Sequence, residues 1–189
     1  MTPGRIMQMR HELYCRGEWT PEAGRYVRRL GIDLRYVEAH AGIFAVCLCK
    51  FFGGNTGEAI FEFSPEGVPA AVIEAFKADG ASVVDLIAWP LDDPEQIATA
   101  GREADMLGIW SMLQRGGRPL RVHRTPEGWL QAKCDGCCVI NPDWGGYWLD
   151  KAGGPFIAED VQHGHELRHV LGRNAARHRL LVPDEARAA

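Results

Sequence analysis

The sequence predicts an α+β protein with an N-terminal helical pair, a four-stranded antiparallel meander and a C-terminal half in which strands and helices alternate. Three observations predict this class. Apolar residues recur at helical spacing before residue 38, and they alternate with a period of two between residues 42 and 90. After residue 118, short apolar runs alternate with segments that carry helix-capping signals, as in α/β units.

Two helices are expected in the first 38 residues. The first has three apolar residues at helical spacing: Ile6, Met9 and Leu13. The second opens with Thr20 as an N-cap candidate and Pro21 in the first helical position, and Gly31 suits the residue just after a helix end. The linking residues "RGEW" are few enough to join the helices as a hairpin.

Four apolar runs between residues 42 and 90 predict the strands of the meander: "GIFAVCLCKF", "EAIFEFS", "AAVIEAFKA" and "SVVDLIAW". Asp79-Gly80 between the last two runs is a hairpin signal. Residues 69–78 have an alternative interpretation as a helix after Pro69, because short apolar runs do not separate the two structures.

A helix is expected over 91–113, either continuous or interrupted near Gly101 or Gly108, since Asp92 or Asp93 can cap it and Pro94 suits its first turn. The remaining elements alternate along the chain: strand 119–123, helix 126–133 capped by Thr125, strand 138–141, aromatic loop or helix 142–154, strand 155–158 and helix 159–178. We expect three regions: a helical segment over 1–38, a core domain over 39–182 and a frayed tail over 183–189.

Composition excludes several classes of protein. No window of the 189 residues is apolar enough to span a membrane, and the N-terminus lacks the apolar stretch of a secretory signal. We therefore expect a cytoplasmic protein whose six cysteines are reduced. The net charge of -4 conceals an acidic middle, because residues 39–164 carry seventeen acidic and nine basic groups. That balance argues against an overall cationic nucleic-acid binder, although a local basic patch remains open.

The segment His165-Glu166-Leu167-Arg168-His169 resembles the HExxH motif of zincin metallopeptidases. The resemblance implies that His165 and His169 bind Zn²⁺ and that Glu166 polarises the bound water. A helical wheel favours another interpretation, since it places the aliphatic residues of this segment on one side and both imidazoles on the other. The aliphatic side contains Val161, Gly164, Leu167, Val170, Leu171 and Ala175. A surface helix that carries histidines is therefore the preferred hypothesis.

The sequence "AKCDGCCVIN" contains Cys134-x-x-Cys137, which admits three interpretations. Together with His165 and His169, the two thiols could complete a structural zinc site, or they could form a redox pair. The simplest interpretation, which we prefer, is that Gly136 makes a turn and the thiols fill space beside a strand.

Arg115, Arg118, Arg121 and Arg124 recur every third residue around two glycines and a proline. A basic loop that enters a strand can bind phosphates, so these residues are candidates for nucleic-acid contact. Further along, Glu159-Asp160 follows a predicted strand. Such carboxylates can be catalytic in α/β sheets, and they equally suit the first turn of the next helix.

The preferred functional hypothesis is a non-catalytic interaction or accessory protein that has a protein partner and no cofactor. A zinc-dependent metallohydrolase acting through His165, Glu166 and His169 is the first alternative. A nucleic-acid-associated protein acting through Arg115–Arg124 is the second.

Overall fold

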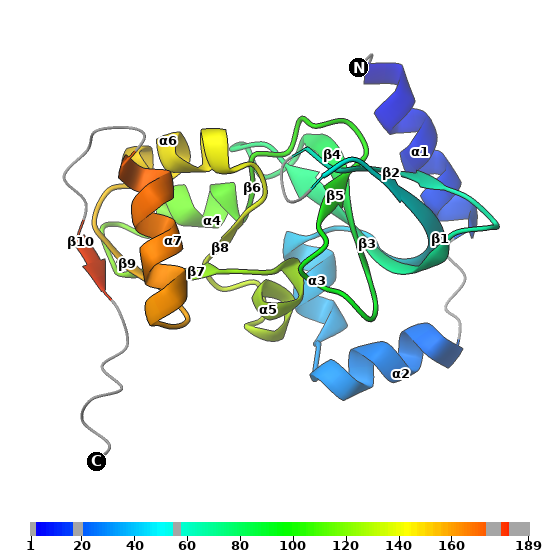
Figure 1. Ribbon diagram of the computed structural model, residues 1–189, viewed down its shortest axis with the longest axis horizontal. Coiled ribbons are helices and arrows are strands. Elements are labelled where there is room, and N and C mark those ends of the chain that lie inside the picture. The colour runs from blue at the N-terminus through cyan, green and yellow to red at the C-terminus, as the bar shows by residue number, and fades with distance from the viewer. Residues whose placement is uncertain (1–2, 17–20, 55–57, 173–178, 182–189) are drawn as a thin grey trace.

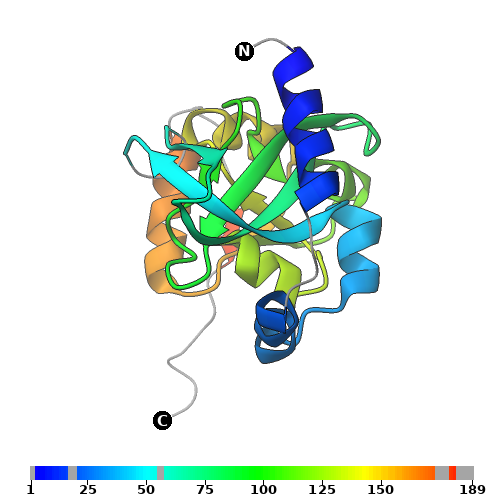
Figure 2. The same ribbon diagram turned by 90° about the vertical axis from the view of Figure 1, so that its right-hand side faces the viewer.

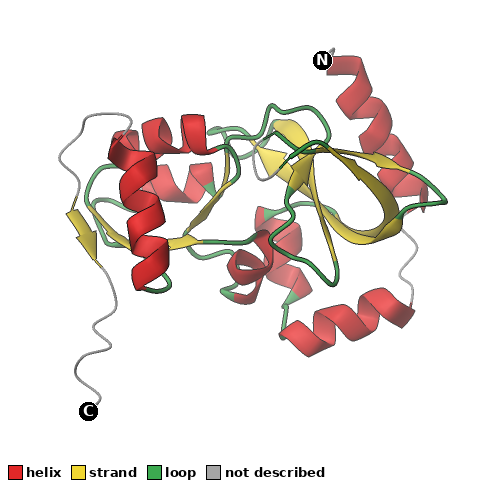
Figure 3. Ribbon diagram, viewed as in Figure 1, coloured by secondary structure: helices red, strands yellow, loops and turns green. Residues whose placement is uncertain are grey.

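The computed structural model describes residues 3–16, 21–54, 58–172 and 179–181, and it has the predicted α+β class. N-terminal helices precede a small closed β-barrel, and a second sheet flanked by helices follows it (Figures 1 and 3). The expected tail, 183–189, lies outside the described residues. Within those residues, no helix combines the length and apolar character that a membrane crossing requires.

Three helices precede the barrel: α1 (Pro3–Arg16), α2 (Pro21–Leu30) and α3 (Leu34–His40). The first two confirm the prediction, and α2 ends at Leu30, just before Gly31, whose φ of 65° is the left-handed value expected after a helix. The predicted cap Thr20 lies outside the described residues. The expected helical hairpin is wrong, because α1 and α2 pack into different core clusters and lie at opposite ends of the barrel (Figures 1 and 2).

The four predicted strands are present, but they form a barrel and not a meander. They are β1 (Phe44–Phe52), β2 (Ile60–Phe63), β3 (Val68–Phe76) and β4 (Val83–Pro90). Strand β1 pairs with both β2 and β3, and the two-residue strand β5 (Ala98–Thr99) joins β2 to β4 and closes the ring. The ambiguous residues 69–78 belong mainly to strand β3, which Asp79-Gly80 connects to β4.

Small side chains fill one core cluster, formed by the barrel strands and α1. Cys47 and Cys49 both lie in this cluster, because residues two apart on a strand point to the same face. Helix α1 contributes its three apolar residues, Ile6, Met9 and Leu13. Six members of this cluster are alanines, whose small side chains allow the strands and α1 to pack closely.

The helix predicted over 91–113 is wrong up to Gly108, and the segment after this glycine is helical. That stretch contains turns, β5, the short strand β6 (Met106–Leu107) and the short helix α4 (Ile109–Gln114). The cause lies in β4, where the buried carboxylate of Asp85 accepts backbone N–H bonds from Gly101, Glu103 and Ala104. These N–H groups satisfy a buried acceptor from another strand, so they are not available for a helix.

The second sheet is parallel except at one edge. Its elements after β6 are β7 (Leu120–His123), α5 (Pro126–Gln131), β8 (Cys137–Val139), α6 (Pro142–Ala152), β9 (Pro155–Ile157), α7 (Val161–Gly172) and β10 (Arg179–Leu181). The strand order is β10-β9-β7-β8-β6, and only β6 runs antiparallel to its neighbour. The predicted cap Thr125 accepts an N–H bond from Gly128 at the start of α5.

The two faces of this sheet are covered differently. Leu120, Val122 and Phe156 pack with residues of α4, α6 and α7 in one core cluster. Helix α5 lies on the other side of β7 (Figure 1), where Trp129 and Leu130 join a cluster that includes barrel residues. The barrel and the sheet therefore share a hydrophobic core, and α5 stands between them.

Candidate functional site

The candidate site lies where the chain connections of the parallel sheet change direction. Strands β7 and β9 are neighbours in the sheet. From β7 the chain passes through α5 to β8, and from β9 it passes through α7 to β10, so the two connections lead toward opposite edges of the sheet. In open α/β sheets, the crevice outside the carboxyl ends of two such strands is the usual ligand site. Residues 124–125 and 158–160, which follow the two strands, border that point.

A crevice of about 620 Å³ lies there. We call it the acidic crevice, and its lining comes from the β4–β5 loop, the β7–α5 junction and α7: Asp93, Glu95, Gln96, Ile97, Arg124, Thr125, Asp160, Gln162 and Glu166. Four carboxylates face one guanidinium, which gives a formal charge of -3. Its volume lies within the range of about 300–1,000 Å³ that is typical of ligand sites.

Arg124 ties the two sides of the crevice together. Its Nη1 and Nη2 each lie 3.1 Å from an oxygen of Asp160, a bidentate arrangement, and its Nε lies 3.4 Å from Glu166 Oε2. Asp160 also accepts the backbone N–H of His163 at 2.7 Å and so caps α7. This backbone bond, followed by Arg124, lowers the pKa of Asp160 below its ordinary value.

Behind the crevice, Glu159 connects two buried histidines. His123 Nδ1 lies 3.3 Å from Glu159 Oε1, and His123 Nε2 lies 2.8 Å from the carbonyl oxygen of Asp135. The contact with His123 is the main cause that lowers the pKa of Glu159. The backbone N–H of Glu159 donates to His163 Nδ1, so a neutral His163 carries its proton on Nε2. Burial lowers the pKa of His163 and favours that neutral form.

These residues are better suited to hold a fixed negative charge than to transfer a proton. A general acid or base works best when its pKa lies near the ambient pH, whereas the pKa values of Glu159 and Asp160 are lowered and both groups are ionised at neutral pH. On the neighbouring strand β8, burial raises the pKa of Cys138 well above its ordinary value, which keeps the thiol protonated.

The HExxH residues of α7 are divided between the crevice and open solvent. His165 and His169 are exposed, and Glu166 lines the crevice, where it contacts Arg124 and accepts a bond from Gln162. The helix buries Gly164, Leu167 and Leu171, so the predicted rotation of its aliphatic side toward the core is confirmed for these three residues.

Two details of that helix differ from the wheel. Val161 was expected on the buried side and is 47% exposed, whereas His163 is only 4% exposed. His163 can be buried because the N–H of Glu159 satisfies one of its ring nitrogens. Ala175, the last residue of the predicted apolar side, lies outside the described residues.

The predicted cysteine ligands lie apart from the histidines and from each other. Cys134 belongs to the core cluster shared with the barrel, where its Sγ lies 3.8 Å from the carbonyl oxygen of Tyr36, and Cys137 belongs to the cluster beneath α4, α6 and α7. Burial raises the pKa of each thiol to about 12. Across the described ranges, no three His, Cys, Asp or Glu side chains are grouped in a way that could hold a metal ion.

The predicted arginine cluster is split between two places. Arg124 lies in the acidic crevice, whereas the other three line a separate hollow of about 450 Å³ beside the amino end of β7, which we call the basic hollow. Its lining is Trp110, Ser111, Gln114, Arg115, Arg118, Pro119, Leu120, Arg121, Asp135, Gly136 and Ile157.

Arg115 serves mainly to hold the chain together. It is 8% exposed, donates to the carbonyl oxygens of Arg118, Pro155 and Ala152, and lies over the ring of Phe156. Its buried Nε has no hydrogen-bond partner among the described atoms. Arg118 and Arg121 are exposed and are the residues of this hollow that can reach a ligand.

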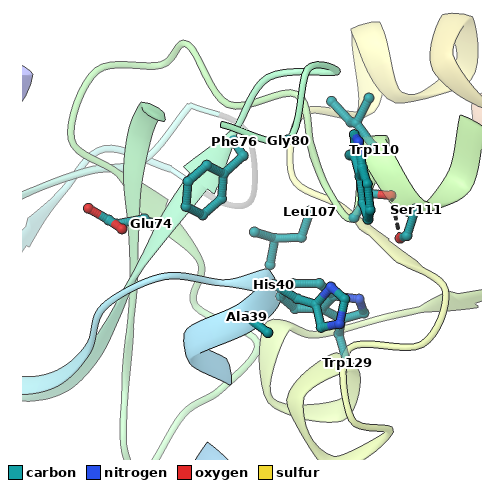
Figure 4. A pocket seen from close by; sticks show the side chains of 11 residues that line it. Ala39, His40, Glu74, Phe76, Gly80, Leu107, Trp110, Ser111 and Trp129 are labelled. Atoms are coloured by element: carbon teal, nitrogen blue, oxygen red, sulfur yellow. Dashed lines mark hydrogen bonds between the residues drawn. The ribbon is translucent and has the colours of Figure 1, made fainter. Parts of the chain in front are cut away.

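A third cavity lies between the barrel and the second sheet, and its lining includes His40, Phe76, Trp110 and Trp129 (Figure 4). Its volume of about 110 Å³ is well below that of typical ligand sites. A substituent on Gly80 would lie 2.7 Å from the Trp110 ring, so this glycine allows the β3–β4 turn to pack against the indole.

Sequence reasoning missed His123, His163, Asp93 and Glu95. A partial signal exists for His123 and for the flagged pair Glu159-Asp160, because all three stand at or just after the ends of predicted strands. Asp93 and Glu95 carry no such signal, since a barrel loop brings them to the crevice.

Comparisons of the chain with protein-family models, with curated proteins and with solved structures found no match.

Proposed function

We propose that this protein is a non-catalytic interaction protein that binds a positively charged segment of a partner protein in the acidic crevice. The observation that carries the proposal is the position and charge of this crevice, in which four carboxylates and one arginine meet at the direction change between β7 and β9.

The chemistry of the lining favours a cationic ligand group. Arg124 is already bound to Asp160 and Glu166, whereas among the described residues Asp93 and Glu95 are exposed and form no ion pair. Carboxylates presented in this way bind the guanidinium of an arginine or the ammonium of a lysine. Fixed negative charge also speeds the approach of a basic partner.

The lowered pKa values of Glu159 and Asp160 keep both carboxylates ionised, which suits binding better than acid–base catalysis. The buried thiol of Cys138 stays protonated and is therefore a poor nucleophile. The six free cysteines suit a reducing compartment, and on that basis we place the protein in the cytoplasm.

Fluorescence anisotropy with a labelled peptide of alternating arginine and serine tests this proposal. The variant Asp93→Asn/Glu95→Gln removes two exposed charges of the crevice and should weaken binding about fivefold, given about 0.2–1 kcal/mol for an exposed ion pair. Affinity should also fall as salt rises, because the charges are accessible to counterions.

The matched control is Glu38→Gln/Glu66→Gln, which removes the same net charge from two exposed residues outside the crevice. We expect the control to bind the peptide as the wild type does. Equal affinity for all three proteins, or no binding at low salt, would overturn the proposed function.

A further inference from the structure

The basic hollow lies beside the amino ends of β7 and β8, away from the acidic crevice at the carboxyl edge. Residues 118–121 and 135–136 lie at the starts of these two strands, and the end of β9 and helix α4 with the residue after it complete the lining. Three arginines and one aspartate give a formal charge of +2. The volume of about 450 Å³ is sufficient for a small ligand.

The strand geometry presents Arg121 to the less covered face of the sheet. Leu120 and Val122 pack beneath α4, α6 and α7, so Arg121 between them points to the opposite face, beside its register partner Ile157. On that face, α5 contacts β7 and β8, and the barrel packs against residues of β6 and β8. The guanidinium of Arg121 is consequently exposed.

The loop before β7 fixes the position of Arg118. Arg115 anchors this loop through the carbonyl oxygens of Arg118, Pro155 and Ala152. Arg118 Nε donates to the carbonyl oxygen of Arg115 at 3.1 Å, which leaves its two terminal nitrogens for a ligand. No ion pair joins Arg118 or Arg121 to an acidic residue that the structure describes. Two arginines with unused donors suit a phosphate group.

Trp110 adds an aromatic surface to the same hollow. Its side chain is 39% exposed and lines the hollow, while Gly80 of the β3–β4 turn packs against the ring. A partly exposed indole in the same hollow as arginines is a combination on which nucleobases stack.

We infer that the basic hollow binds a nucleotide unit, with Arg118 and Arg121 on its phosphate and Trp110 against its base. The source of that unit is either a free nucleotide or one residue of a single-stranded nucleic acid, because both present the same chemistry. This ligand goes beyond the cationic segment proposed for the acidic crevice, and the two sites can fail independently.

Anisotropy of a labelled single-stranded oligothymidine, measured at low and moderate salt, tests the inference. The variant Arg118→Gln/Arg121→Gln should weaken binding about tenfold or more and should reduce the slope of log affinity against log salt by about 0.7, the value for one phosphate contact on a single strand. Trp110→Leu should weaken binding with little change in that slope, because it removes stacking and not charge.

The control variant Arg25→Gln/Arg28→Gln removes the same charge from exposed residues of α2 and should bind as the wild type does. Competition by unlabelled thymidine monophosphate distinguishes the sources. Displacement of the oligomer at comparable nucleotide concentrations identifies a free nucleotide, and failure to displace it identifies nucleic acid. Absence of oligomer and monophosphate binding at low salt, or equal weakening in both arginine variants, would refute the inference. Circular dichroism melting confirms that each variant is folded.

Discussion

The two edges of the parallel sheet differ in charge, although arginines lie at or beside both ends of β7. At the amino end of β7, Arg118 and Arg121 are exposed in a hollow of formal charge +2. At the carboxyl end, Arg124 is bound by Asp160 and Glu166 in a crevice of formal charge -3. Arginines at equal spacing in the sequence therefore have different electrostatic roles, which depend on the residues that the fold places beside them.

The two edges also differ in how they are held in place. At the amino edge, a buried arginine binds backbone carbonyl oxygens, so Arg115 holds the loop without using an acidic side chain. At the carboxyl edge, side-chain ion pairs and the capping bond of Asp160 connect β7 to α7. We expect the first edge to depend little on pH and the second to weaken in acid.

The largest expected effect concerns the anchor of the amino edge. Arg115→Met removes the donor to three carbonyl oxygens and should lower the free energy of unfolding by about 3 kcal/mol, because buried acceptors lose their partner. The exposed Arg121→Met should change it by less than about 0.5 kcal/mol. Urea denaturation of both variants measures the difference. Equal destabilisation would show that Arg115 is not a special anchor.

A reciprocal charge reversal tests whether the two sites are separate. Asp93→Lys/Glu95→Lys should weaken binding of the arginine peptide at least about tenfold, because like charges then face each other, and should leave oligothymidine binding unchanged. Arg118→Glu/Arg121→Glu should have the opposite pattern. Anisotropy with both probes on both variants measures this. Loss of both activities in either variant would mean that the two edges act as one surface.

A smaller effect is expected from acid at the carboxyl edge. The folded-state pKa values of Glu159 and Asp160 lie below the unfolded values of about 4, so both groups stabilise the protein above that pH, and this contribution is lost as the pH falls further. Glu159→Gln/Asp160→Asn should be less stable than wild type at neutral pH, and the difference should shrink below about pH 4. Urea midpoints across this range measure it. A difference independent of pH would contradict this assignment.

The smallest effect is expected from metal removal. His165 and His169 are exposed on α7, and Cys134 and Cys137 lie in separate core clusters, so a chelator should leave the melting temperature unchanged. Elemental analysis of purified protein, with His165→Ala as the comparison, provides the measurement. One equivalent of zinc that disappears in His165→Ala would restore the metallohydrolase hypothesis and place a third function beside the crevice.

Sequence patterns located most elements because their signals are local. Thr125 caps α5, Asp79-Gly80 turns β3 into β4, and Leu167 and Leu171 of α7 face the core. The expected helix over 91–113 failed because of a distant residue: Asp85, in β4, binds the backbone of residues 101–104. A capping motif and a proline cannot reveal such a competing acceptor.

The candidate site was predictable only in part, for the same reason. The strand-terminal position of Glu159-Asp160 marked one side of the crevice, and the arginine spacing marked residues of both edges. The direction change between β7 and β9 depends on strand order, and the carboxylates of Asp93 and Glu95 arrive from the barrel.

By itself, the sequence determined the α+β class, the cap of α5, the β3–β4 hairpin and the acidic middle of the chain, because residues close together in the chain encode these features. Only the tertiary structure decided that the strands close into a barrel, that β9 lies beside β7, and which charged groups stand together. These outcomes depend on hydrogen bonds and packing between segments far apart in sequence, whose free energies do not appear in any local pattern.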